Sequence, residues 1–180
     1  AAMADLQRHL GAKPYLLSDH PEAGFNQRMT DIQGALGSAQ MSRAQEIVEE
    51  RQKLAQIYDD AFADLDWLRT PLCPDGFNHG YQSYACMYRP DTDNSDELRA
   101  TNEARNKGME KLQSNGISTR PATHAVHMLS YYQKKYDLSP EDFPYAFAAN
   151  DCSISLPLFN GMTEIEQEYV IEKVLGSFGK

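Results

Sequence analysis

The stretch Gly24-Phe25-Asn26-Gln27-Arg28-Met29-Thr30-Asp31-Ile32-Gln33 joins a polar loop to the beginning of a long helix. Thr30 is a favoured N-cap residue, and Gln33 three positions later completes the pattern of a capping box. The aspartate after the cap adds a negative charge in the first turn, where the helix dipole stabilises it. A loop that feeds a helix N-terminus can also receive an anion, and Asn26 and Arg28 lie in this loop. On pattern alone, an ordinary capped helix remains the commoner interpretation.

Composition excludes several classes of protein. The 180 residues carry 17 basic and 26 acidic side chains, a net charge of −9, and 41% of the residues are hydrophobic. The acidic balance argues against nucleic acid or an anionic membrane as the main partner. No apolar run approaches the roughly 18 residues of a membrane-spanning helix. We also expect no signal peptide, and the three widely spaced cysteines favour a cytoplasmic location over a disulfide framework.

A long helix is predicted from residue 30 to about residue 62, where apolar side chains recur at steps of three and four. Its first third is rich in glycine, alanine and serine. Such a small face suits close contact with another helix or subunit. Alternatively, Gly34 and Gly37 only weaken the helix, by about 1 kcal/mol each relative to alanine. Ser42 suits a second N-cap, which predicts a break near Met41.

After residue 65 the pattern changes to short extended segments and further helices. A short extended piece is predicted at 67–71 and strands at 82–89, 117–120 and 152–156. Helices are predicted from an N-cap at Ser95 to residue 114, at 127–136, after residue 144, and from a second capping box at Thr163 and Glu166. This order predicts a small α+β domain with a short, mostly antiparallel sheet and helices on one face, preceded by the long helix.

The residues that carry possible chemistry are few. His124 and His127 have the spacing of a metal pair, but no cysteine or carboxylate cluster accompanies them, so we expect no metal site. Arg120 next to Pro121 is either a surface arginine or part of a pocket. The two histidines have the same two interpretations, a pocket or a structural role. The tyrosines at 131, 132 and 136 favour packing over recognition.

Several motifs are informative because of the order in which they occur along the chain. Over residues 22–175 the sequence resembles the DegT/StrS-type aminotransferases, which are pyridoxal-phosphate enzymes acting on keto sugars attached to nucleotides. The resemblance rests on the segment 24–40, an arginine-rich helix from Arg51 to Tyr58, Asn115-Gly116-Ile117-Ser118-Thr119-Arg120-Pro121, the following His127, Phe143-Pro144-x-Ala146, and Ser155-Leu156-Pro157-Leu158-Phe159-x-x-Met162-Thr163.

The resemblance implies the C-terminal portion of a fold type I aminotransferase. Residues 1–29 would then be the tail of a large domain and an active-site loop, residues 30–65 a linking helix, and residues 66–180 the small C-terminal α+β domain. Enzymes of this family are homodimers whose active sites use both subunits. Two departures from the family pattern are Gln27, where many relatives carry an aromatic residue, and the run 121–127, so the identity of the sugar stays open.

The resemblance also assigns roles to individual residues. Asn26 would contact the phosphate of pyridoxal 5'-phosphate across the dimer interface. Arg28, Arg120, His124 and His127 would bind the sugar-nucleotide substrate, since the planar fork of arginine suits a diphosphate. The lysine that forms a Schiff base with the cofactor has no recognisable setting here. The cofactor would therefore be held mainly by the N-terminal domain, no catalytic residue is assigned in this chain, and the chain alone is expected to be inactive.

The implied reaction transfers an amino group from an amino acid, with glutamate as the expected donor, to a keto sugar nucleotide. The resemblance places this reaction in the synthesis of polysaccharide or antibiotic sugars. Two alternatives remain open. The chain is either a free-standing dimerisation or regulatory domain without catalysis, or it comes from a lysine-less relative that acts as a sugar dehydratase or a sensor.

Overall fold

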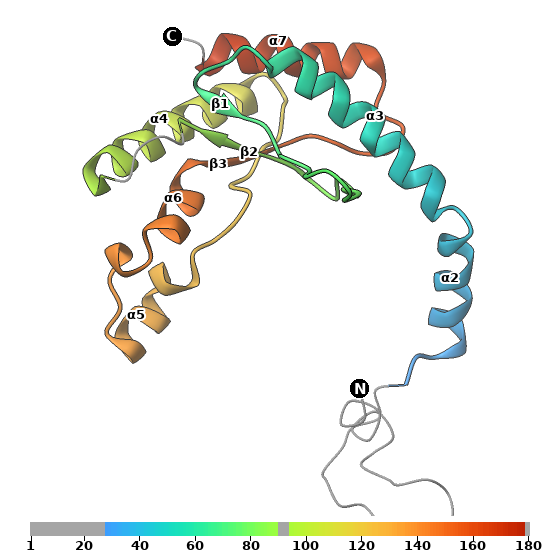
Figure 1. Cartoon of the computed structure of the whole chain (residues 1–180), viewed down its shortest axis with the longest axis horizontal. Helices are drawn as coiled ribbons and strands as arrows, with labels where there is room; N and C mark the ends of the chain where they lie inside the picture. Colours follow the sequence, from blue (N-terminus) through green and yellow to red (C-terminus); the bar gives the residue numbers. More distant parts are fainter. Residues whose placement is uncertain (1–27, 90–93, 179–180) are drawn as a thin grey trace, which may run out of the picture. The chain divides into compact units, whose positions relative to one another are not determined.

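The computed structural model describes residues 28–89 and 94–178. The described residues fall into two compact units, divided between residues 45 and 46. Helix α2 (Asp31–Met41) belongs to the first unit. Helix α3 (Ala44–Phe62) begins with the last two residues of the first unit and continues into the second (Figure 1).

The predicted capping box at the start of α2 is confirmed. The backbone N–H of Gln33 donates to Oγ1 of Thr30 at 3.3 Å, and the backbone N–H of Thr30 donates to Oε1 of Gln33 at 3.0 Å. The predicted break is also confirmed, because α2 ends at Met41 and α3 begins at Ala44. The second N-cap at Ser42 is wrong. Ser42 has helical backbone angles and its hydroxyl donates to the carbonyl of Ala39 at 2.8 Å, so it closes α2.

A three-stranded antiparallel sheet forms the centre of the second unit. Strands β1 (Leu68–Arg69), β2 (Tyr84–Tyr88) and β3 (Ser153–Leu156) lie in the order β1-β2-β3. The strand predicted at 117–120 is wrong in extent, since only a single bridge joins Arg120 to Ser155. The reason is local: the N–H of Ile117 donates to the carbonyl of Leu112 at 2.9 Å and completes the end of the preceding helix.

The helices of this unit are α4 (Ser95–Ser114), α5 (Ser130–Tyr136), α6 (Pro144–Cys152) and α7 (Glu164–Phe178), with short 3₁₀ turns η1 (Val126–Met128) and η2 (Pro140–Asp142). The cap of α4 is Asn94 rather than the predicted Ser95. Its side chain accepts the N–H groups of the second and third helical residues at 2.9 and 3.4 Å. The capping box of α7 at Thr163 and Glu166 is confirmed.

The main core lies between one face of the sheet and helices α3, α4 and α7 (Figure 1). Alternate residues of β2 point into this core and are buried, beginning with Tyr84. The side chain of Met87 points to the opposite face of the sheet. It packs against a smaller hydrophobic cluster that joins α4 to α6 through Leu98 and Phe147. Helix α6 therefore contacts the sheet from the other face and places its C-terminus beside the beginning of β3.

Candidate functional site

Residues 120–127, hereafter the anchored loop, contain three of the five candidate site residues and are held by the junction of α6 and β3. Three backbone groups of the loop make hydrogen bonds to this junction. These are the carbonyl of Arg120 with the N–H of Ser155 (2.7 Å), the N–H of Ala122 with Oγ of Ser153 (3.1 Å), and the N–H of Ala125 with Oδ1 of Asn150 (3.0 Å). The loop is therefore fixed at both ends and in the middle although it forms no strand.

Two of the candidate side chains on this loop, those of Arg120 and His124, are exposed, and His127 is buried. Nε2 of His127 lies 3.1 Å from the carbonyl oxygen of Pro140, and its ring centroid lies 5.0 Å from that of Phe143. His127 thus ties the end of the loop to η2. The structure brings the three candidates onto one anchored loop, and no hydrogen bond joins their side chains to one another within residues 94–178.

The other two candidates precede α2 in the sequence. Arg28 is exposed in the residues that lead into α2. Asn26, the expected contact of the cofactor phosphate, lies outside the described residues.

A buried arginine that the sequence analysis missed lies beneath the anchored loop. Arg105 of α4 is 3% exposed, and its Nη1 donates to the carbonyls of Asn150 and Ser153 at 3.0 and 2.8 Å. Its Nε and Nη2 donate to Oδ1 of Asn106 at 3.2 and 2.9 Å. Burial lowers the pKa of Arg105, and the nearby carboxylate of Asp151 opposes that shift. The sequence signal was the position of Arg105 on the same helix face as the buried leucines.

A second arginine, Arg51 of α3, joins two loops of the second unit. Its Nε donates to Oδ1 of Asn160 at 2.9 Å, and its Nη1 donates to the carbonyls of Tyr81 and Gln82 at 3.0 and 2.9 Å. Asn160 in turn donates to Oε2 of Glu50 at 2.7 Å. Oxygen atoms of the protein therefore accept hydrogen bonds from Nε and Nη1 of this guanidinium, and its role is structural. A surface cavity of about 370 Å³ beside it is lined by loop residues, among them Tyr81 and Gln82.

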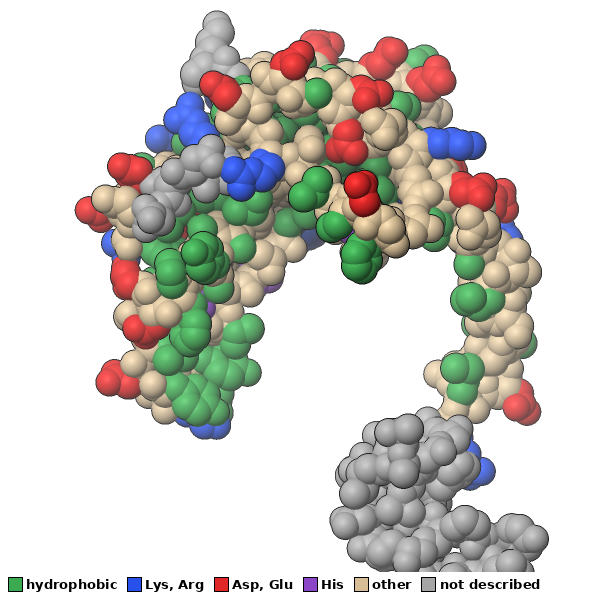
Figure 2. Space-filling model, in the orientation of Figure 1, with side chains coloured by type: hydrophobic (Ala, Val, Ile, Leu, Met, Phe, Trp, Pro, Cys, Tyr) green, Lys and Arg blue, Asp and Glu red, His purple; other side chains and the backbone are tan. Residues whose placement is uncertain are grey.

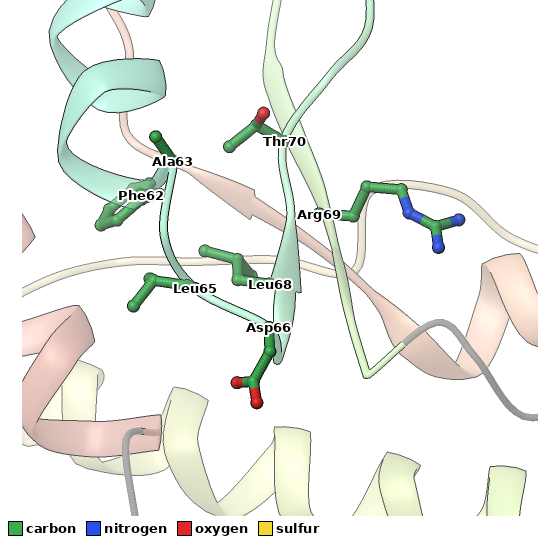
Figure 3. A pocket seen from close by; sticks show the side chains of 7 residues that line it. All are labelled: Phe62, Ala63, Leu65, Asp66, Leu68, Arg69 and Thr70. Atoms are coloured by element: carbon green, nitrogen blue, oxygen red, sulfur yellow. The ribbon is translucent and has the colours of Figure 1, made fainter.

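A smaller cavity of about 270 Å³ lies where α3 runs into β1 (Figure 3). Its two charged lining side chains, Asp66 and Arg69, point in different directions. It offers no convergent set of polar groups for a ligand.

The described part of the chain holds neither a cluster of metal-ligand side chains nor a membrane-spanning helix. Across residues 28–89 and 94–178, no three histidine, cysteine or carboxylate side chains are grouped to hold a metal ion. Over the same ranges, no helix combines the length and the apolar character needed to cross a membrane.

The lysines of the described ranges do not fit the role of a Schiff-base residue. Such a lysine works from a desolvated pocket that lowers its pKa. The six described lysines are exposed or half-buried, and none of them lines either cavity; they are Lys53, Lys107, Lys111, Lys134, Lys135 and Lys173. These residues alone do not make a site for pyridoxal phosphate.

Exposed aromatic side chains gather over α5 and the start of α6 (Figure 2). Tyr132 stacks on Tyr136 with ring centroids 6.3 Å apart, and Tyr131 packs edge-on against Tyr132 at 5.1 Å. The tyrosines therefore pack against one another, but at the surface: Tyr131 is 61% and Tyr136 is 56% exposed.

Comparison with known proteins identifies the family. The model of the DegT/DnrJ/EryC1/StrS aminotransferase family matches residues 3–175. The chain belongs to this family. Spore coat polysaccharide biosynthesis protein SpsC of Bacillus subtilis is 30% identical over 152 residues, which cover 84% of this chain and 37% of SpsC. GDP-perosamine synthase of Caulobacter vibrioides is 29% identical over 172 residues, covering 95% of this chain and 43% of that enzyme.

Solved structures show that the fold is that of an aminotransferase domain. Spr1654 of Streptococcus pneumoniae has a TM-score of 0.82 at 20% identity in its apo form, over 97% of this chain and 42% of Spr1654; PMP and PLP forms of that protein match as well. PseC of Helicobacter pylori, an aminotransferase of pseudoaminic acid biosynthesis, has a TM-score of 0.78 at 22% identity, over 97% of this chain and 45% of PseC. The chain thus spans about two fifths of the length of the family members it matches.

Proposed function

We propose that the complete protein is a pyridoxal-phosphate-dependent aminotransferase whose acceptor is a keto sugar nucleotide. With glutamate as donor, the reaction converts glutamate and the keto sugar nucleotide to 2-oxoglutarate and the amino sugar nucleotide. The observation that carries the proposal is the family match over residues 3–175. A relative named for GDP-perosamine synthesis and another named for polysaccharide biosynthesis support a nucleotide-linked sugar as the acceptor.

The cofactor, when bound, supplies the group that accepts the amino function from the donor and passes it to the sugar. Because the described lysines do not fit a Schiff-base role, the proposal places that lysine and most of the cofactor contacts in an N-terminal domain. Asn26 is proposed to donate its side-chain amide to the cofactor phosphate of the other subunit in a cytoplasmic homodimer. No step of the reaction is assigned to the described residues; their proposed task is to bind the substrate.

Arg120 and His124 are the proposed contacts of the sugar nucleotide in the anchored loop. Both side chains are exposed on a backbone that is held in place, so they can meet a ligand without first ordering the loop. The guanidinium of Arg120 suits the diphosphate, and the imidazole of His124 suits a sugar hydroxyl or a phosphate oxygen. His127 fixes the end of the same loop, and Arg28 is proposed as a further contact of the substrate.

The test uses the full-length enzyme with its cofactor. Formation of 2-oxoglutarate from glutamate should require a keto sugar nucleotide, and mass spectrometry should detect the amino sugar product. Replacing Arg120 with lysine should raise the KM for the sugar nucleotide about tenfold, because one bidentate charge-assisted contact is lost. The matched control is Arg69→Lys, an exposed arginine on β1 at the opposite edge of the sheet. Equal effects of the two variants would contradict the assignment of Arg120.

The same preparation separates the alternatives. A natural protein with an intact mass near the 20.3 kDa of this chain would be a free-standing domain and would contradict the aminotransferase proposal. A longer protein that consumes the sugar nucleotide without forming 2-oxoglutarate would instead be the lysine-less dehydratase.

A further inference from the structure

The anchored loop owes its shape to side chains that lie about thirty residues further along the chain. Two of its three backbone contacts use a side-chain acceptor, Oγ of Ser153 for the N–H of Ala122 and Oδ1 of Asn150 for the N–H of Ala125. His124 lies between these two fixed amides. Beyond the bridge at Arg120 the loop has no strand partner, so the path of its backbone through His124 depends on these two acceptors.

The two acceptors are themselves fixed. The buried side chain of Arg105 donates to the backbone carbonyls of both Asn150 and Ser153, and these contacts hold the end of α6 and the beginning of β3 together. Nδ2 of Asn150 donates to Oδ1 of Asp151 at 2.7 Å. Because the amide nitrogen faces a carboxylate, the amide oxygen is left to accept the N–H of Ala125. The orientation of the Asn150 amide is therefore determined by its surroundings.

We propose that Asn150 and Ser153 are positioning residues of the sugar-nucleotide site, which hold the anchored loop so that Arg120 and His124 face the substrate. The inference rests on the proposed function, since it takes the anchored loop to be part of that site. Neither residue touches the ligand in this scheme. Each acts through a backbone amide of the loop, and Arg105 and Asp151 hold the pair in place.

The experiment compares variants of the full-length holoenzyme by hydrogen–deuterium exchange and by kinetics. Ser153→Ala and Asn150→Ala each remove one acceptor. Ser153→Thr keeps the hydroxyl and should restore the wild-type values. The matched control is Asn102→Ala on α4: Nδ2 of Asn102 donates to the carbonyl of Asp151 at 3.2 Å, so this variant also loses a hydrogen bond of the junction but none to the anchored loop.

We expect Ser153→Ala and Asn150→Ala to speed exchange in peptides covering residues 118–129, and to raise the KM for the sugar nucleotide about fivefold, as for the loss of one hydrogen bond. The KM for glutamate should stay within about twofold, because the effect is confined to the binding of the second substrate. Asn102→Ala should change neither the exchange of these peptides nor the KM for the sugar nucleotide.

Hydrogen–deuterium exchange and the KM for the sugar nucleotide test different parts of the inference. Unchanged exchange in the two acceptor variants would overturn the positioning role, whatever the enzyme does. Faster exchange with an unchanged KM for the sugar nucleotide would show that the side chains hold the loop but that the loop is not part of the substrate site. That result would overturn the inference, because it would contradict the part of the proposed function on which the inference rests. Equal effects on the KM for both substrates, or an equal effect of Asn102→Ala, would show a general loss of structure and would also overturn it.

Discussion

The contact between Gly108 of α4 and Phe178 of α7 allows a sharp prediction about how these helices pack. A Cβ atom added at Gly108 would lie 2.5 Å from Cδ1 and Cζ of Phe178, and closer still to Cε1. The ring cannot easily move away, because Phe178 is 5% exposed and is enclosed by Trp67 and Tyr88, at centroid distances of 6.0 and 5.2 Å. Gly108→Ala should therefore destabilise the second unit even though alanine is the better helix former.

The magnitude follows from two opposing terms. Overpacking of a filled core typically costs about 1–3 kcal/mol, and alanine returns about 1 kcal/mol of helix propensity. Because the clashing ring is enclosed, the upper part of the overpacking range, about 2–3 kcal/mol, applies. We therefore expect Gly108→Ala to lower the free energy of unfolding by about 1–2 kcal/mol. The control is Gly176→Ala in α7, where an added Cβ meets no atom within 4 Å. That change should raise the free energy of unfolding by about 0.5–1 kcal/mol.

Urea unfolding, followed by circular dichroism, measures both variants against the wild-type chain. The double variant Gly108→Ala/Phe178→Leu adds a further check, because a smaller side chain at 178 removes the clash and should reduce the cost of the alanine. A Gly108→Ala protein as stable as the wild type, or more stable, would refute the close packing of α4 against α7. The close packing would also be refuted if Gly108→Ala lowered the free energy of unfolding equally in the wild-type chain and in the Phe178→Leu variant.

Three further predictions concern the same unit. Replacing Arg105 with methionine should cost about 2–4 kcal/mol in urea unfolding, because the buried carbonyls of Asn150 and Ser153 lose their donor; a cost below that of an ordinary surface substitution would contradict this. Thr163→Ala should cost about 1 kcal/mol through loss of the α7 capping box, and Thr163→Ser should cost far less in the same assay. Burial raises the pKa of Cys152 from 9.0 to about 11, so the folded state keeps its proton where the unfolded state loses it. The stability from this thiol is complete below pH 9 and falls as the pH rises from about 9 to 11; Cys152→Ala should show a shallower decline in melting temperature over that window.

The parts of the fold that depend on neighbours in sequence could be predicted from sequence. The capping boxes at Thr30 and Thr163 and the helix end at Gly116 use partners within five residues, and all three are confirmed. The errors also have local causes. The cap of α4 moves from Ser95 to Asn94 because the longer asparagine side chain reaches two backbone amides.

The arrangement of the candidate site could not be predicted in the same way. The pattern predicted Arg120 at the end of a strand, where the structure has only a single bridge to Ser155, and it gave no hint of what holds the segment that follows. Its acceptors, Asn150 and Ser153, come from a helix end and a strand beginning about thirty residues away. A side chain that bonds across such a distance leaves no periodic signal in the sequence.

The burial of Arg105 explains why the junction can hold a loop at all. Removing a guanidinium from water is costly unless its N–H groups find acceptors. Here the acceptors include the carbonyl of Asn150 in the last turn of α6, where the helix leaves carbonyls without intrahelical partners and where the helix dipole favours a positive charge. The same contact therefore satisfies the arginine and the helix end together. Because Nη1 of Arg105 donates to both carbonyls, a shift of β3 relative to α6 would break one of these hydrogen bonds, and the contact therefore holds the two residues that anchor the loop near each other.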